Sequence, residues 1–242
     1  MSPSSGSGVS LSSMRLLYSP MVTVRVGPDK QDFCIHKELL CSKSTYFAKA
    51  LSGQFKEAQT GIVELEDVHV VLFRVFVAWL YPSKVAYESS DSGASSKDEF
   101  AQLNTVLEEQ HPYEAEDYEN EDIPVNVSDD DLSKFEGETP QSWTYLVLGA
   151  MFVLADRLDA AELKRQTLDF MTRRKIIGII PSDSAILYAY ANTTRKSPLR
   201  QLLVNIAAYD TAFMGDHNLY NHLPVEYLSA VMVVMSKRLL HK

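Results

Sequence analysis

The segment FCIHKELLCSKSTYF holds both cysteines of the chain and one of its six histidines, as Cys34, His36 and Cys41. Thiolates and imidazoles are zinc ligands, and a thiolate is also a nucleophile. A structural zinc site normally has four ligands, and this segment supplies three. The sequence therefore favours a structural role, with both thiols buried and the histidine packed. A metal site or a thiol enzyme that uses Cys34, His36 and Cys41 is the alternative.

A second group of ligand-type residues, Asp216, His217 and His222, lies in the segment GDHNLYNH. Its spacing matches no face of a helix, and its glycine and asparagine residues indicate a loop, so we predict no metal site there. The sequence contains no glycine-rich phosphate loop, no G-x-S-x-G and no H-E-x-x-H. We therefore predict no catalytic, cofactor-binding or metal-ligating residue.

The charge of the chain is concentrated in one segment. Residues 88–138 contain seventeen acidic and two basic residues, a local charge of −15, whereas the whole chain of 242 residues carries −9. The remainder is mildly basic but has no long run of Lys or Arg, which argues against a direct nucleic-acid partner. The longest apolar runs are far shorter than the roughly 18 residues of a membrane span. The serine- and glycine-rich start is not typical of a signal peptide. Two cysteines are too few for a disulfide framework, so we expect a cytoplasmic or nuclear location.

The first 81 residues combine strands and helices. Alternating valines predict a strand over 21–26, and a turn at GPDK followed by QDFCI predicts a hairpin over 21–35. HKELLCS and STYFAKAL indicate two short helices, with Ser44 as the N-cap of the second. GIVEL, 61–65, reads as a third strand. Residues 69–81 are apolar almost all round, which predicts a deeply buried helix.

Residues 88–141 are predicted to be a largely disordered insertion, because they combine high charge with few large apolar residues. Within it, Phe100, Leu103 and Leu107 would share one face of a helix over 96–110, which is a candidate partner-binding helix. Ser128 precedes three aspartates, a context that acid-directed kinases favour, and is a candidate phosphosite.

The remainder of the chain, from 142 onward, reads as helices. SWTYLVLGAMFVLADRL and DAAELKRQTLDFMTRR form the first pair, with Asp159 as the expected N-cap of the second helix. Three further helices are predicted to begin at Ser182, at Ser197 and near Pro224.

The motifs VTVRVG, F-x-IHKELLCSKSTYF, GQFKEA, I-x-ELED, F-x-x-W-LY and VLADRLDAAELK occur in the order typical of the BTB/POZ fold, which the chain resembles over about 21–81 and 142–210. YANTTRKSPLRQLLV is similar to the helical extension of many fungal BTB proteins. The resemblance implies an α+β fold with a small three-stranded sheet, a helical core and additional C-terminal helices. The expected organisation is a short N-terminal segment (1–18), a BTB/POZ domain (19–174) interrupted by the acidic insertion, and a C-terminal helical extension (175–242).

The resemblance also implies function: a non-catalytic protein–protein interaction module that self-associates, serves as an adaptor, or both. Family members commonly form homodimers through their first helix and the hairpin, and often exchange an N-terminal strand. Met14, Leu16, Leu17 and Tyr18 are the apolar candidates for self-association in the segment before the first strand. Most members place an acid just before the first strand, where this chain has Pro20 and Met21. A substrate adaptor for a cullin ubiquitin ligase is the alternative function, although EGETPQS, before the helix from 142, lacks the hydrophobic-x-acidic triplet of many cullin-binding members.

Overall fold

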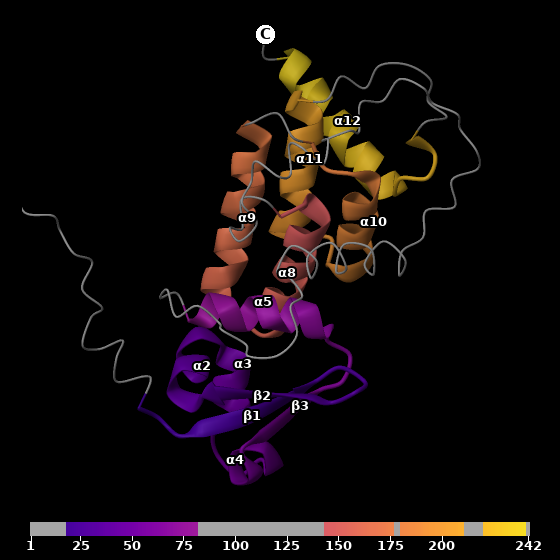
Figure 1. The fold of residues 1–242 in the computed structure, drawn as a ribbon. Helices are drawn as coiled ribbons and strands as arrows, with labels where there is room; N and C mark the ends of the chain where they lie inside the picture. Colours follow the sequence, from indigo (N-terminus) through magenta and orange to yellow (C-terminus); the bar gives the residue numbers. More distant parts are fainter. Residues whose placement is uncertain (1–17, 82–142, 177–179, 211–219, 241–242) are drawn as a thin grey trace, which may run out of the picture. The chain divides into compact units, whose positions relative to one another are not determined.

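The computed structural model describes residues 18–81, 143–176, 180–210 and 220–240 (Figure 1). The chain divides into two compact units. The first comprises residues 1–86 with 154–162, and the second comprises residues 87–153 with 163–242. Within the described ranges, no helix is both long enough and apolar enough to cross a membrane.

The first unit contains a three-stranded sheet built from β1 (Met21–Val26), β2 (Gln31–His36) and β3 (Ile62–Leu65), in the order β2-β1-β3. The hairpin predicted over 21–35 is present: β1 pairs with β2 antiparallel and with β3 parallel. Gly27 allows the hairpin turn to form, because its φ of 76° is unfavourable for other residues. A Cβ atom at this position would also lie 2.9 Å from Cγ2 of Val70.

Four helices complete this part of the first unit: α2 (Lys37–Lys43), α3 (Thr45–Ala50), α4 (Lys56–Thr60) and α5 (Val70–Leu80). Figure 1 shows α2, α3 and α5 on one side of the sheet. Ser44 ends α2 and caps α3 as predicted, since its Oγ accepts a hydrogen bond from the backbone N–H of Phe47 at 3.2 Å. The short helix α4 was not predicted; it ends at Gly61, which adopts a φ of 67°.

The core of this unit lies between the helices and the sheet. Its fully buried large side chains are Ile35, Leu40, Phe47, Leu65, Phe73, Phe76 and Leu80. The prediction of a deeply buried helix over 69–81 holds for one side of α5 only. Leu72, Phe73 and Phe76 face the core, but Ala78 is exposed and Arg74 is half-buried. One side of α5 is therefore only partly covered despite its apolar sequence.

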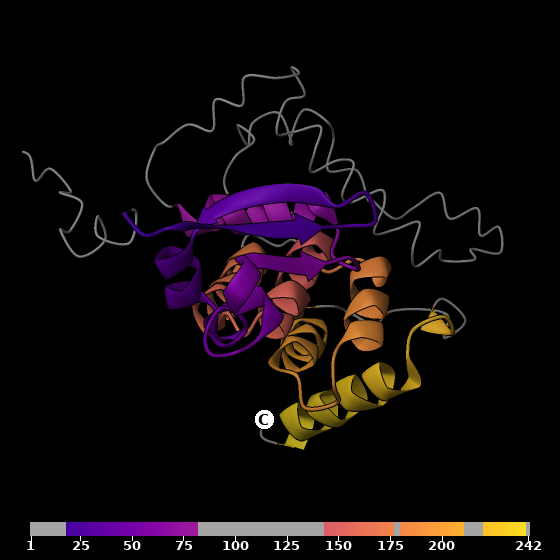
Figure 2. The same cartoon turned by 90° about the horizontal axis from the view of Figure 1, so that it is seen from below.

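The C-terminal part of the chain is helical, with α8 (Tyr145–Arg157), α9 (Ala161–Ile176), α10 (Asp183–Asn192), α11 (Pro198–Asp210) and α12 (Val225–Leu240). The division between the two units falls inside α8 and α9. In the second unit, α11 and α12 lie side by side, as both views show (Figures 1 and 2). Ser182 caps α10, and Ser197 precedes Pro198 at the start of α11, as the sequence predicts. The mixed α+β architecture is confirmed.

Asp159 has a different role from the predicted one. It adopts a φ of 48° immediately after α8, and its N–H donates to the carbonyl of Asp156 at 3.2 Å. The N–H of Ala160 donates to the carbonyl of Ala155 at 2.8 Å. This pattern is a Schellman motif, so Asp159 ends α8 rather than capping α9.

Candidate interaction surface

The two faces of the sheet differ in burial. Along β1, Val22, Val24 and Val26 are buried in the core, whereas Met21 is exposed and Thr23 and Arg25 are half-buried on the opposite face. The strand register continues this alternation into β2 and β3. We call the open face, with its adjoining turn residues, the outer sheet surface; it comprises Met21, Thr23, Arg25, Lys30, Asp32, Cys34, His36, Ile62, Glu64 and Glu66.

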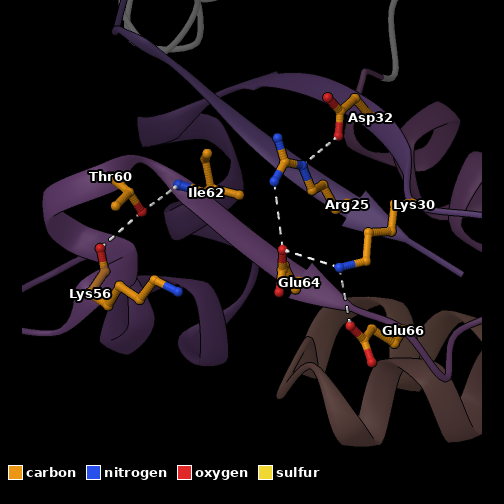
Figure 3. Close-up of polar contacts among 8 residues, drawn as sticks. All are labelled: Arg25, Lys30, Asp32, Lys56, Thr60, Ile62, Glu64 and Glu66. Atoms are coloured by element: carbon orange, nitrogen blue, oxygen red, sulfur yellow. Dashed lines mark hydrogen bonds and ion pairs between the residues drawn. The ribbon is translucent and has the colours of Figure 1, made fainter. Parts of the chain in front are cut away.

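One half of the outer sheet surface is a chain of ion pairs (Figure 3). Arg25 in β1 lies between Asp32 in β2, at 3.0 Å, and Glu64 in β3, at 3.6 Å. Lys30 extends the chain, with its Nζ 3.9 Å from Glu64 and 3.6 Å from Glu66. These side chains are accessible to solvent, so each pair contributes at most about 1 kcal/mol to folding. The array presents alternating charges to solvent, each paired with a neighbour on the same surface.

The other half of the surface is formed by the side chains of Met21, Thr23, Cys34, His36 and Ile62. Cys34 and Ile62 stand on either side of Thr23, and Met21 stands opposite His36. The ring Nδ1 of His36 lies 2.9 Å from the hydroxyl of Tyr81, which also accepts a hydrogen bond from the His36 N–H at 3.2 Å. This arrangement leaves a small, weakly polar area beside the ion pairs.

The segment that enters β1 is fixed at the start of α2. The N–H of Lys37 donates to the carbonyl of Pro20 at 2.9 Å, and the N–H of Glu38 donates to Oγ of Ser19 at 3.1 Å. Despite this anchoring, the side chain of Tyr18 is 82% exposed and that of Met21 is 50% exposed. Two large apolar side chains thus stand in solvent next to a backbone that hydrogen bonds hold in place.

The expectation that both thiols are buried is wrong for Cys34. Cys34 and His36 lie on one face of β2 and Ile35 on the other, as the alternation predicts, but the face of Cys34 is the open one and its side chain is exposed. Cys41 in α2 is half-buried. Burial is the largest influence on its thiol and raises its pKa above the ordinary value, although the nearby Lys37 ammonium opposes the shift. A raised pKa disfavours the reactive thiolate.

The described residues give no support to a metal site. Among them, no three His, Cys, Asp or Glu side chains lie close enough together to hold a metal ion, so Cys34, His36 and Cys41 do not form such a group. His222 instead has its Nε2 2.7 Å from a carboxylate oxygen of Asp183.

Several predicted site residues lie outside the described ranges. These are Met14, Leu16 and Leu17 of the candidate self-association segment, the candidate helix with Phe100, Leu103 and Leu107, the candidate phosphosite Ser128, and Asp216 and His217. Tyr18 is the member of the self-association group that the structure describes, and it is exposed, as a contact residue must be before its partner binds.

Comparison with protein families connects this geometry to a known class. The family model of the BTB/POZ domain matches residues 20–115. This part of the chain is a BTB/POZ domain. A comparison with curated proteins found no match. BTB domains mediate protein–protein interaction and are typically non-catalytic. The sheet, the helices α2 to α5 and the outer sheet surface all lie within the matched range.

Sequence reasoning did not identify the charged half of this BTB surface. The sequence does contain the alternating pattern of a charged strand face, because Arg25 alternates with the valines of β1, and Glu64 lies between Val63 and Leu65 in β3. Alternation predicts that such residues face solvent, but only the strand order β2-β1-β3 places Arg25 between Asp32 and Glu64.

Proposed function

We propose that this chain is a non-catalytic protein–protein interaction module that binds a second copy of itself through the segment entering β1 and serves as an adaptor for other proteins. The observation that carries this proposal is the exposure of Tyr18 and Met21 beside the backbone held at the start of α2. Large apolar side chains that are exposed together commonly mark an interface. Met14, Leu16 and Leu17 extend the same apolar segment in the sequence.

This contact would be stabilised by the burial of apolar surface next to a backbone that is already held in place at the start of α2. Removing apolar area from water contributes roughly 25 cal/mol per Å². Ordering a segment on binding costs free energy that reduces this gain. Because hydrogen bonds from Lys37 and Glu38 already hold the backbone of Pro20 and Ser19, part of that ordering cost is met before a partner arrives.

The finer features of the function form part of the same proposal. The protein would act in the cytoplasm, the nucleus or both, and α10–α12 would form the helical extension of fungal BTB proteins. A cullin is the alternative partner, in which case the chain would serve as a substrate adaptor of a ubiquitin ligase.

The proposal is tested by co-purification of two differently tagged copies of the full chain. We expect the wild-type copies to co-purify, and a variant in which Leu16→Asp and Leu17→Asp are combined to lose most of the recovered partner copy. Phe55→Asp is the matched control, because Phe55 is another exposed apolar side chain of the first unit. If the wild-type copies do not co-purify, or if all three proteins behave alike, self-association through this segment is wrong. Stoichiometric binding of a purified cullin by the chain would support the alternative.

A further inference from the structure

The helix α12 carries a second apolar stripe on the side that faces solvent. Val225, Leu228, Met232, Met235 and Leu239 follow one another at spacings of three, four, three and four residues. Val225, Met232 and Leu239 are 77%, 68% and 73% exposed, and the two residues between them are half-buried. We call these five residues the α12 outer stripe.

A neighbouring side of α12, about a quarter turn around the helix from the centre of the stripe, holds the helix in the second unit. Tyr227 and Val231 are buried there, and α12 packs against α11. The guanidinium of Arg238 donates to the carbonyl of Ala208 at 3.2 Å and stacks 5.1 Å from the ring centroid of Tyr209. These contacts hold the helix without Val225, Met232 and Leu239, so the exposure of these three apolar side chains is not explained by the folding of this unit.

The spacing of the stripe specifies the kind of partner. Apolar residues that alternate at three and four residues form the seam of a coiled coil, in which each side chain inserts between side chains of a facing helix. Ser229 and Ser236 flank the seam and are small enough to allow close approach. The complementary surface is another amphipathic helix with the same spacing, and α12 of a second copy is such a helix.

We propose that two copies of the chain associate through the α12 outer stripe, with the two helices antiparallel. In this register Met232 lies on the two-fold axis, Val225 faces Leu239 of the second copy, and Leu228 lies within one residue of the level of Met235 of the second copy. Charge favours this direction, because the exposed Glu226, which also pairs with Arg200 of its own chain at 3.3 Å, lies near the start of α12, and Lys237 lies near its end. Antiparallel pairing brings opposite charges together, whereas parallel pairing would place Glu226 beside Glu226 of the second copy.

The size of the stripe sets the strength of the contact. A helix of 16 residues is about 24 Å long at ~1.5 Å per residue. One helical stripe of that length buries less than the roughly 800 Å² per partner of a standard stable interface. The contact is therefore a weak one that is populated at high protein concentration. It also differs from the proposed contact at the start of β1, so each can be tested without the other.

Cysteine cross-linking in the full chain tests this arrangement. Cys34→Ser and Cys41→Ser remove the native thiols, and single cysteines are then placed at 225, 232 or 239 under mild oxidation. We expect Met232→Cys to form a disulfide-linked dimer. We expect a mixture of the Val225→Cys and Leu239→Cys variants to form the mixed dimer in several-fold excess over either variant alone. Thr172→Cys, at an exposed position of α9, gives the background of random collision.

The outcomes separate the alternatives. If Met232→Cys and the 225/239 mixture cross-link no more than Thr172→Cys, copies do not pair through α12 and the proposal is wrong. If Val225→Cys alone cross-links as well as the mixture does, the helices are parallel and the proposed register is wrong. The same measurements with Leu16→Asp and Leu17→Asp added distinguish this contact from the proposed function. Cross-linking that persists in that background belongs to α12, and cross-linking that disappears there would assign both effects to the segment before β1.

Discussion

Oγ of Ser44 donates a hydrogen bond to the backbone carbonyl of Leu158 over 2.5 Å, although the two residues are 114 positions apart in the sequence. The same oxygen accepts from the N–H of Phe47 at 3.2 Å, and Ser44 is 1% exposed. One hydroxyl therefore caps α3 and satisfies a carbonyl at the end of α8 within the first unit.

Substitution of Ser44 tests this double role. We expect Ser44→Ala to lower the free energy of unfolding by about 2–3 kcal/mol, because it removes an N-cap and leaves a buried carbonyl without this donor. Ser42→Ala is the matched control, since Ser42 is exposed and donates only to the nearby carbonyl of Leu39; its effect should stay within about 0.5 kcal/mol. Denaturant unfolding measures both. Equal losses in the two variants would mean that the bond to Leu158 contributes nothing.

The imidazole of His69 should make the stability of the first unit depend on pH. Its Nδ1 accepts the capping hydrogen bond from the N–H of Val71 at 3.3 Å, which requires a neutral ring, and burial lowers its pKa below the ordinary 6.5. The unfolded chain then binds this proton more readily than the folded chain does. The contribution is complete above pH 6.5 and is lost as the pH falls through 6.5 toward the folded pKa.

The measurement for His69 is unfolding at pH 7.5 and at pH 5.5. His69→Asn keeps a capping oxygen but does not titrate. We expect the wild type to lose more stability than His69→Asn over this interval. A parallel loss in the two proteins would show that groups other than His69 set the pH dependence.

The two cysteines should differ in reactivity. Cys34 is exposed on β2, whereas Cys41 is half-buried with a raised pKa. A disulfide reagent added to the native chain should modify one thiol at least several-fold faster than the other, and Cys34→Ser should abolish the fast phase. Loss of the fast phase in Cys41→Ser would reverse this assignment. Zinc that co-purifies stoichiometrically and is lost in the Cys34→Ser/Cys41→Ser double variant would restore the metal-site alternative.

Arg200 in α11 has a structural role that lysine cannot fill. Its guanidinium donates to the carbonyls of Tyr190, at 2.7 Å, and Thr193, and it lies 4.3 Å from the ring centroid of Tyr190. We expect Arg200→Lys to destabilise the chain by about 2–3 kcal/mol, because an ammonium cannot make this set of contacts. Arg165→Lys is the control, since Arg165 forms an exposed pair with Asp169 and should cost less than about 0.5 kcal/mol. Thermal unfolding of the two variants should differ clearly.

Local patterns predicted the features that depend on neighbouring residues. The valines of β1 alternate, and the serine caps at 44, 182 and 197 bond within three residues, so the sequence is sufficient for these elements. Asp159 was misassigned because an aspartate can either cap a helix or adopt a positive φ after one. The helix α4 was missed because five residues carry too little periodicity.

The candidate surface depends on contacts that the sequence does not encode locally. Alternation placed Cys34 and His36 on one face of β2 but could not say whether another element covers that face, and Cys34 proved to be exposed. The three- and four-residue spacing of the apolar residues of α12 is visible in the sequence. However, α12 has apolar residues on two sides, and a fully buried helix would have the same pattern. Only the packing of Tyr227 and Val231 against the unit leaves Met232 and Leu239 outside.

Light scattering of the purified full chain tests the central claim, self-association through the segment before β1, most directly. At micromolar concentration, where the weak α12 contact is not populated, we expect the wild type to have about twice the 27.2 kDa mass of one chain. The Leu16→Asp/Leu17→Asp variant should return to 27.2 kDa with an unchanged circular dichroism spectrum. A wild type that stays at 27.2 kDa at every concentration, or a double variant that remains dimeric, would contradict the account.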